Sequence, residues 1–331
     1  MSSHQHSSFH ITSSQLHLNW SKSLTPVMTV PSGSEITFDL RDGGNLQIRP
    51  DNAATSLSDF DFSQADPAQG PIYIDTAEPG DVLKIEFLDL VPGSYGWTAI
   101  FPGFGLLSDE FPDPVLKIWD LSPSKKTATF KSGIEVPVRP FLGIVGVAPA
   151  VEGELSTIPP YAKSGGNMDC RDLSRKGSTL YLPVNVPGAL FSCGDGHAAQ
   201  GDGEVCGTAI ETTMKVRLRL TVEKRSLRQE RGYAIQCPHF VTPPPTKEDV
   251  EARMAAESKG EYAVLGIHED MREATRMAVR GMIDWLEAEK GLTRVEAYML
   301  ASVGAGLKFA EVVDMPNFGV VCSMPLSVFV E

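Results

Sequence analysis

An acidic, glycine-rich segment at residues 194–204 contains the side chains of this chain that are best suited to chemistry. It reads GDGHAAQGDGE, and its polar side chains are Asp195, His197, Gln200, Asp202 and Glu204. In an extended strand, side chains two residues apart lie on the same side, so we expect Asp195 and His197 to point together. A carboxylate and an imidazole are a suitable ligand pair for zinc or a related divalent cation. The segment predicts a cation or substrate site, and the same composition would also suit an acidic hairpin with a solvated histidine.

A second glycine-rich turn, Gly166-Asn167-Met168-Asp169, also ends in an acid. It gains a functional meaning only if the fold brings the Asp169 carboxylate to the first segment. His17 lies in the string LHLNW, where it alternates with leucines and reads as a strand position. Its side chain could face the core, solvent or a site.

The chain has an odd number of cysteines and no CxxC spacing: Cys170, Cys193, Cys206, Cys237 and Cys322. This pattern predicts free thiols in a reducing compartment, and it argues against a zinc finger or a disulfide framework. The N-terminal string MSSHQHSSFHITSS lacks the features of a secretory signal, so we expect a cytoplasmic protein. Cys193 and Cys206 flank the acidic segment, and nearby carboxylates would suppress their thiolate forms. A cysteine nucleophile at either position remains an alternative.

The composition narrows the class of partner. The chain has 331 residues, and 29 Lys and Arg against 42 Asp and Glu give a formal charge of −13. This balance argues against nucleic-acid partners and anionic membrane surfaces, which need clustered basic side chains. No apolar stretch approaches the ~20 residues that a membrane-spanning helix needs. Nucleophile-elbow, Walker A and dinucleotide-binding motifs are absent.

Short runs rich in Val, Ile, Leu and Phe alternate with glycine and proline between about residues 26 and 245. Strings such as GPIYIDTAEPGDVLKIEFLDL read as strand, turn, strand. This pattern predicts a mainly β fold, with a jelly-roll or β-sandwich-like body and a smaller C-terminal α/β part. We expect a disordered leader at residues 1–14, an N-terminal β domain at 15–142, a second β unit carrying both glycine-rich loops at 143–242, and the α/β part at 243–331.

The C-terminal part carries helix signals. Over residues 269–289 apolar side chains recur on one helix face, and Gly291 follows, which predicts a helix that ends there. Thr293 and Glu296 predict the capped start of a short helix through Ala297–Val303. A weaker signal predicts a helix over 246–257, and the last residues read as two strands around a turn.

Several strings resemble the acetamidase/formamidase family, and they run from about His17 to Val328. They are PVMTVPSGSEITFDL, GPIYIDTAEPGDVLKIEFLDL, WTAIFPGFGLLSDEF, GGNMD, PVNVPGALFSCGDGHAAQGDGEVCGTAIE and AYMLASVGAGLKFAEVVD. The most specific is GD-x-H-x-x-Q-GDGE, in order with GGNMD and AEPGDVL.

The resemblance implies hydrolysis of short aliphatic amides to a carboxylate and ammonia. It also implies a β body with a smaller α/β part, a homodimer or dimer of dimers, and a divalent metal, zinc before calcium or magnesium. On matching positions it implies Asp169, Asp195 and His197 as metal ligands. Glu204 would be the general base and acid, with Asp202 as its competitor for either role. The expected substrate contacts are His17, Asn167 and Gln200.

The chain departs from the family pattern in its leader, at residues 50–67, and at Gln69-Gly70-Pro71, where relatives have a histidine-containing loop. These departures concern substrate scope more than reaction type. A rival of another class is a jelly-roll protein that holds Ca²⁺ or a sugar through the acidic loop without turnover, because glycine-rich acidic loops suit calcium.

Overall fold

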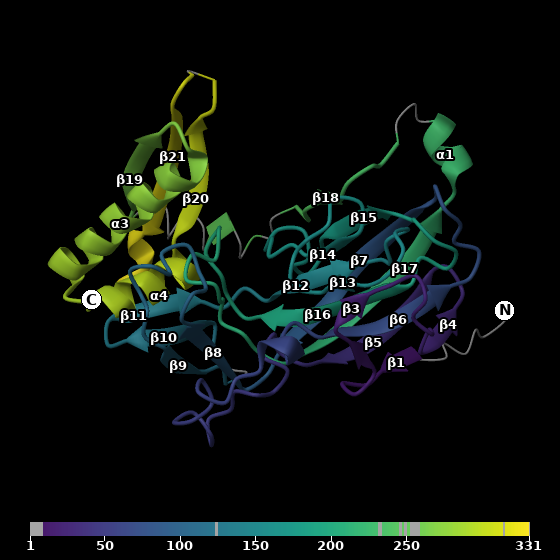
Figure 1. The fold of residues 1–331 in the computed structure, drawn as a ribbon, viewed down its shortest axis with the longest axis horizontal. Coiled ribbons are helices and arrows are strands. Elements are labelled where there is room, and N and C mark those ends of the chain that lie inside the picture. The colour runs from purple at the N-terminus through teal and green to yellow at the C-terminus, as the bar shows by residue number, and fades with distance from the viewer. Residues whose placement is uncertain are drawn as a thin grey trace.

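Two β-sheets stacked face to face form the body of the protein, as seen in the computed structural model (Figure 1). The structure describes residues 9–122, 125–230, 234–244, 247, 250–251, 259–313 and 315–330. The first sheet contains, in spatial order, β1 (Phe9–Ile11), β5 (Ser34–Leu40), β17 (Met214–Glu223), β7 (Val82–Pro92), β15 (Thr179–Pro183) and β18 (His239–Val241). The second contains β14 (Gly165–Asn167), β12 (Phe141–Gly146), β16 (Phe191–His197), β6 (Ala68–Ile74) and β2 (Leu16–His17), with β4 (Met28–Val30) beside β6.

Side-chain periodicity explains the packing of the two sheets. β17, with the sequence MKVRLRLTVE, alternates buried apolar residues with exposed or half-buried polar ones, as a strand with one solvated face does. β12, with the sequence FLGIVG, is buried throughout, because other segments cover the second sheet on its outer face as well. The core between the sheets includes Phe38, Phe87 and Phe191. The expectation of a mainly β, sandwich-like body is confirmed.

The two expected β units do not separate in space. The boundary expected at residues 142–143 lies inside β12, and each sheet takes strands from both sides of it. In a sandwich, neighbouring strands are often distant in sequence, so a division of the chain by local composition misses this interleaving. The expected disordered leader is also corrected, because residues 9–11 form β1 and pair in parallel with β5. Residues 1–8 lie outside the described residues.

A second, smaller lobe stands beside the body (Figure 1). Its sheet contains β19 (Glu261–His268), β21 (Phe318–Pro325) and β20 (Gly306–Glu311), and its helices are α3 (Met271–Lys290) and α4 (Arg294–Gly304). Two hairpins pack with it: β8 (Tyr95–Ile100) with β9 (Val115–Asp120), and β10 (Thr127–Lys131) with β11 (Ile134–Pro137). The remaining short elements are β3 (Asn19–Trp20), η1 (Phe62–Gln64), β13 (Leu155–Ser156), α1 (Arg225–Glu230) and η2 (Leu326–Val328).

Both helices of this lobe begin and end where the sequence predicts. Asp270 caps α3, and Gly291 ends it in a left-handed conformation at φ 61°. Thr293 and Glu296 form a reciprocal capping box at the start of α4. The helix expected over 246–257 falls mostly outside the described residues. No helix in the described part of the chain has the length and apolar character to cross a membrane.

The acidic segment connects the body to the second lobe. It begins at the end of β16, whose Phe191 and Cys193 belong to the core of the sandwich. A few residues later, Val205 and Cys206 are buried in the core of the second lobe. The glycine-rich loop is therefore held at both ends by packed apolar side chains.

Candidate active site

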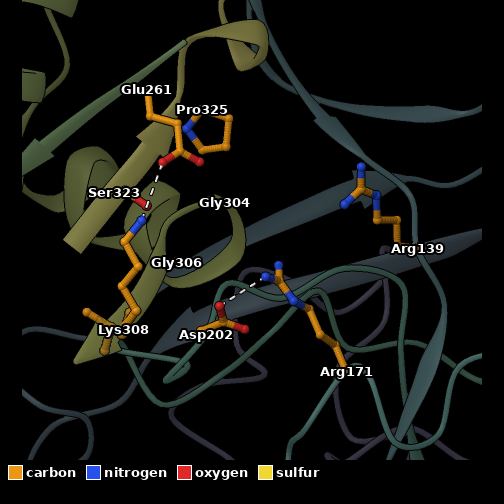
Figure 2. Close-up of a pocket in the computed structure, with 10 residues that line it drawn as sticks. Arg139, Arg171, Asp202, Glu261, Gly304, Gly306, Lys308, Ser323 and Pro325 are labelled. Carbon is orange, nitrogen blue, oxygen red and sulfur yellow. Dashed lines mark hydrogen bonds and ion pairs between the residues drawn. The ribbon is translucent and has the colours of Figure 1, made fainter. Parts of the chain in front are cut away.

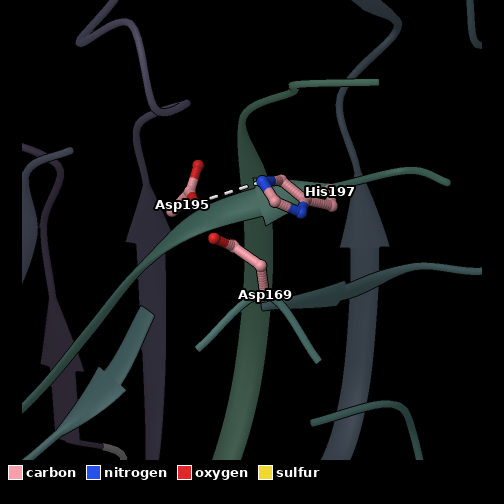
Figure 3. Close-up of side chains that lie close together, drawn as sticks. All are labelled: Asp169, Asp195 and His197. Atoms are coloured by element: carbon pink, nitrogen blue, oxygen red, sulfur yellow. Dashed lines mark ion pairs between the residues drawn. The ribbon is translucent and has the colours of Figure 1, made fainter. Parts of the chain in front are cut away.

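The end of β16 brings Asp195 and His197 together. Asp195 has a left-handed backbone at φ 55°, which departs from regular strand geometry. His197 Nε2 lies 3.1 Å from Asp195 Oδ2, and both side chains are buried (Figure 3). The expectation that these two side chains point together is confirmed.

The GGNMD turn adds Asp169 to this pair. β14 pairs with β12, the neighbour of β16, so the turn that follows β14 lies beside the acidic segment. The backbone N–H of Met168 donates to Gly143 O at 3.0 Å, which fixes the turn against β12. One ligand atom each from Asp169, Asp195 and His197 lie within 4.8 Å of one another (Figure 3). The structure thus joins the two glycine-rich loops that the sequence separates.

Two glutamates approach His197 from the segment after β16. Ligand atoms of His197, Glu204 and Glu211 also lie within 4.8 Å of one another. Glu211 Oε2 is 3.2 Å from His197 Nε2, and Glu211 Oε1 accepts a hydrogen bond from the backbone N–H of Ala209 at 2.9 Å. Glu211 is therefore fixed beside the imidazole.

A loop from the N-terminal part completes the cluster with Asp66. The backbone N–H of Asp66 donates to Gly43 O at 2.7 Å. A Cβ at Gly43 would lie 2.6 Å from Asp195 Oδ1 and 3.1 Å from both Asp66 Oδ1 and Glu211 Oε2. A larger residue at this position would force the Asp195 carboxylate to move.

Glu211 and Asp66 are the site residues that the sequence analysis missed. Glu211 follows Ala209 and Ile210 directly, and a lone acid after such apolar residues is the signal that could have found it. Asp66 precedes Pro67 in the stretch that departs from the family pattern, and no local motif marks it. Tertiary pairing alone brings Asp66 to the cluster.

Burial and mutual repulsion raise the pKa values of the acids in this cluster. Burial is the largest cause that raises the pKa of Asp195 to about 6 and that of Asp169 to about 7. Burial and then the Asp169 charge hold the pKa of Glu204 well above its ordinary range, and the Glu204 side chain is hydrogen-bonded to Asp169. Burial opposes the charge of His197, but Asp195 and Glu211 raise its pKa well above the ordinary value.

The donor set fits a divalent metal ion. Asp169 Oδ1, Asp195 Oδ1 and Glu211 Oε2 are buried and have no hydrogen-bond partner. Buried acceptors without a partner are costly, and a cation between them would satisfy them. No Lys or Arg is among the described residues that line this cavity, so no side-chain cation of the lining offsets the clustered carboxylates.

A cavity of about 350 Å³ opens beside the cluster. Its polar side is formed by Asp66, Asp169, Asp195, Glu204 and Glu211, with Asn167 and Thr208 nearby. Its other side is apolar and includes Phe60, Phe62, Trp97, Phe101 and Phe104. The cavity can therefore hold a small molecule with its polar group against the acids.

Of the three expected substrate contacts, one lines the cavity and two lie outside its lining. Asn167 lines the cavity, and its Oδ1 is buried without a partner, so it is available to a ligand. Gln200 lies outside the lining and donates from Nε2 to Asp169 O at 2.8 Å, so it positions the Asp169 backbone. His17 also lies outside the lining, with its Nε2 2.8 Å from Ser192 Oγ in a buried part of the second sheet. Neither Gln200 nor His17 is among the described residues that line this cavity.

Asp202 and Glu204 line two different cavities. It lines a separate cavity of about 280 Å³ together with Arg139, Arg171 and Lys308 (Figure 2). Its carboxylate forms an ion pair with Arg171 at 3.0 Å (Figure 2). Asp202 and Glu204 therefore line different cavities, on either side of Gly203 in the chain.

The two candidate nucleophilic cysteines are in hydrophobic cores. Cys193 is buried in the sandwich, and burial raises its pKa well above the ordinary value. Cys206 is buried in the second lobe, where burial also raises its pKa. Neither lines the cavity beside the cluster. These surroundings disfavour the thiolate that a cysteine amidase needs.

The fold and this site define the protein as a β-sandwich enzyme with a buried carboxylate–histidine centre. The family comparison then identifies it further: the profile of the Acetamidase/Formamidase family matches residues 4–154 and 150–331. The chain belongs to this family and is an amidase, a hydrolase of amide C–N bonds.

Relatives in sequence and structure agree with this assignment. The chain is 26% identical to the formamidase of Methylophilus methylotrophus, over 95% of this chain and 89% of that protein. It is 29% identical to the acetamidase of Mycolicibacterium smegmatis, over 59% of this chain and 63% of that protein. The structure of a γ-lactamase from Delftia acidovorans matches with a TM-score of 0.84 at 25% identity, over 95% of this chain and 89% of the other. An acetamidase from Bacillus halodurans matches with a TM-score of 0.64 at 28% identity, over 97% and 98% of the two chains.

Proposed function

We propose that this amidase hydrolyses primary carboxamides of the formamide and acetamide type to a carboxylate and ammonia. A divalent cation, zinc by preference, would be held by Asp169, Asp195, His197 and Glu211. The observation that supports this proposal is the convergence of an imidazole and of buried carboxylate oxygens without a hydrogen-bond partner beside a cavity, in a chain of an amidase family. The acetamidases and formamidases among its relatives support the substrate class.

A bound cation would polarise the amide carbonyl and lower the pKa of a water molecule beside it. The protein's own residues have the other tasks. Asn167 Oδ1, which is buried without a partner at the cavity, can accept a hydrogen bond from the amide N–H₂ group. Hydrolysis forms a C–O bond from water and breaks the C–N bond, so one proton must move from water to the departing nitrogen.

Glu204 is suited to move this proton. A carboxyl group with a pKa raised toward the working pH can accept a proton from water and then donate it to the amide nitrogen. Burial and Asp169 raise the pKa of Glu204 in that direction. The nitrogen leaves poorly unless it is protonated, so this transfer is needed for C–N cleavage.

His197 favours zinc over calcium. Calcium sites are built from oxygen ligands, whereas zinc binds imidazole nitrogen and carboxylate oxygen together. His197 Nε2 lies close to both Asp195 and Glu211, so the imidazole would share the cation with carboxylates. Zinc is therefore the first metal to test, with calcium and magnesium as comparisons.

An ammonia-release assay on formamide and acetamide tests the proposal. We expect activity in the purified protein, loss of activity after treatment with a chelator, and recovery when zinc is added back. Full activity after metal removal, combined with inactivation by iodoacetamide, would instead support Cys193 or Cys206 as the nucleophile.

We also propose a homodimer or dimer of dimers in the cytoplasm. The described cysteines are all free, which supports a reducing compartment. Leu265 and Ile267 of β19 are each 52% exposed, and such neighbouring apolar side chains favour a protein contact. Light scattering on the purified chain would show the subunit number, and a monomer at micromolar concentration would contradict the assembly.

A further inference from the structure

Aromatic side chains form a continuous wall on the apolar side of the active-site cavity. The ring centroid of Phe101 lies 4.7 Å from that of Phe60 and 5.0 Å from that of Phe62. The Phe62 and Phe104 centroids are 6.3 Å apart. Trp97 contacts the same group, with its centroid 6.4 Å from that of Phe101. We call Phe60, Phe62, Phe101 and Phe104 the aromatic wall.

The aromatic wall has a rigid base and an uncovered rim. Phe101 is buried in a small core with Trp97, and Phe60 packs against that core. At the rim, Phe62 is 46% exposed and Phe104 is 43% exposed. Ile158, which also lines the cavity, is 38% exposed. A bound hydrocarbon group would cover these side chains, and their removal from water would favour binding.

The size of the cavity exceeds the needs of the smallest amides. Its volume is about 350 Å³, whereas an apolar cavity of roughly 150 Å³ already holds a benzene molecule. Formamide or acetamide with its polar group at the acids would leave most of the aromatic wall exposed to water. A substrate that fills the cavity carries a substituent of about the size of a benzyl group.

The charges around the cavity show that this substituent is uncharged or cationic and not anionic. The described lining contains Asp66, Asp169, Asp195, Glu204 and Glu211 and no Lys or Arg. An anionic substituent would be repelled by these acids. A cationic group would be attracted by the acids and by the ring faces, but it would lose hydration against the hydrocarbon of the rim, a cost that a neutral hydrocarbon does not have. The chemistry of the wall therefore favours a neutral hydrocarbon.

We propose that the preferred substrates are primary amides whose acyl group is an aryl or branched hydrocarbon, and that the aromatic wall selects them over acetamide. This inference rests on the proposed function and names its substrate class. Phe60 and Phe62 come from residues 50–67, the stretch in which this chain departs from the family pattern. Phe101 and Phe104 belong to WTAIFPGFGLLSDEF, one of the strings that resemble the family, so the wall joins two rings of a family-like string to two rings from the divergent stretch.

Steady-state kinetics on acetamide, butyramide, hexanamide and phenylacetamide with the zinc-loaded protein test the inference. We expect kcat/KM to rise along the series and to be at least about tenfold higher for phenylacetamide than for acetamide, because each buried methylene contributes to discrimination. Phe62→Ala and Phe104→Ala should each lower the ratio of kcat/KM for phenylacetamide to that for acetamide by about tenfold. Phe62→Leu should restore part of the ratio, because it returns apolar volume to the rim.

A matched control comes from Phe309, which is 62% exposed on β20 and does not line the cavity. Phe309→Ala should leave the ratio unchanged. A ratio at or below one in the unmodified protein, or an equal ratio in Phe62→Ala and Phe309→Ala, overturns this inference alone. Absence of hydrolysis of every amide in the series overturns the proposed function and this inference with it.

Discussion

Two acids of the same GDGE string have different chemistry because their surroundings differ. Glu204 is close to Asp169 and lines the active-site cavity, where burial raises its pKa. Asp202, two residues earlier, is paired with Arg171 and lines another cavity. The spacing of the residues along the chain does not distinguish these positions. From the sequence alone Glu204 is the first candidate and Asp202 its competitor, and only their three-dimensional surroundings distinguish the two side chains.

At the scale of single residues, we predict that Glu204→Gln lowers kcat by about 10²–10⁴-fold, the typical contribution of a proton-transfer group. The amide keeps the shape of the carboxyl group but cannot accept and return the proton. Zinc content should stay near that of the unmodified protein, because the proposed ligands remain. Asp202→Asn is the matched control and should change kcat little. Near-normal turnover in Glu204→Gln would show that its role is assigned wrongly.

At the scale of elements, β12 holds the two halves of the cluster at a fixed separation. It pairs with β14 on one side and β16 on the other, so it lies between the strands that lead to Asp169 and to Asp195. Its Gly143 faces both carboxylates: a Cβ there would overlap Asp195 Oδ2 and lie 2.6 Å from Asp169 Oδ1. The strand thus needs glycine at this point to let the acids meet.

Gly143→Ala should weaken zinc binding by about 10–100-fold, a loss typical for altered support of metal ligands. The methyl group would push Asp169 and Asp195 apart. Gly304→Ala is a suitable control, because a Cβ at Gly304 meets only ordinary contacts of 3.6 Å or more. Zinc affinity can be measured by competition with a chromophoric chelator. Equal affinity in the two variants would contradict the role that we give to β12.

Local signals predicted the elements better than their pairing. The caps at Gly291, Thr293 and Glu296 are short-range features, and they located α3 and α4 correctly. The expected convergence of Asp195 and His197 is also found, although the left-handed backbone of Asp195 departs from the strand geometry on which that expectation was based. Glu211 and Asp66 reach the cluster through long-range pairing, which no local pattern encodes. The interleaving of strands between the two sheets was missed for the same reason.

At the scale of the whole molecule, folding confines several carboxyl groups away from water. The pKa of Asp195 is raised to about 6 and that of Asp169 to about 7, whereas an unfolded chain has values of about 3.9. At pH values between the unfolded and the folded pKa, these two groups bind more protons in the metal-free folded chain than in the unfolded chain. The contribution of these two carboxyl groups to the stability of the metal-free folded chain is therefore fully present below about pH 4, and it is lost as the pH rises through 6 and 7. His197, whose pKa is also raised, contributes in the same direction.

We predict that zinc stabilises the protein more as the pH rises from 5 to 8, because metal binding needs the carboxylates deprotonated. A ligand at 100 times its Kd adds about 2.7 kcal/mol to the free energy of unfolding. The difference in Tm between zinc-loaded and metal-free protein, measured by calorimetry across this pH range, should increase. In Asp195→Asn the difference should be small at every pH. A Tm difference that shrinks with rising pH would contradict the linkage.

The most direct test of the central claim is the position of the metal in a crystal of the active protein. We expect an anomalous-scattering peak at the zinc edge within about 2.0–2.2 Å of His197 Nε2 and of an Asp195 carboxylate oxygen. Asp169 and Glu211 should complete the coordination. A crystal of protein that hydrolyses acetamide but shows no metal peak among these residues would contradict the account.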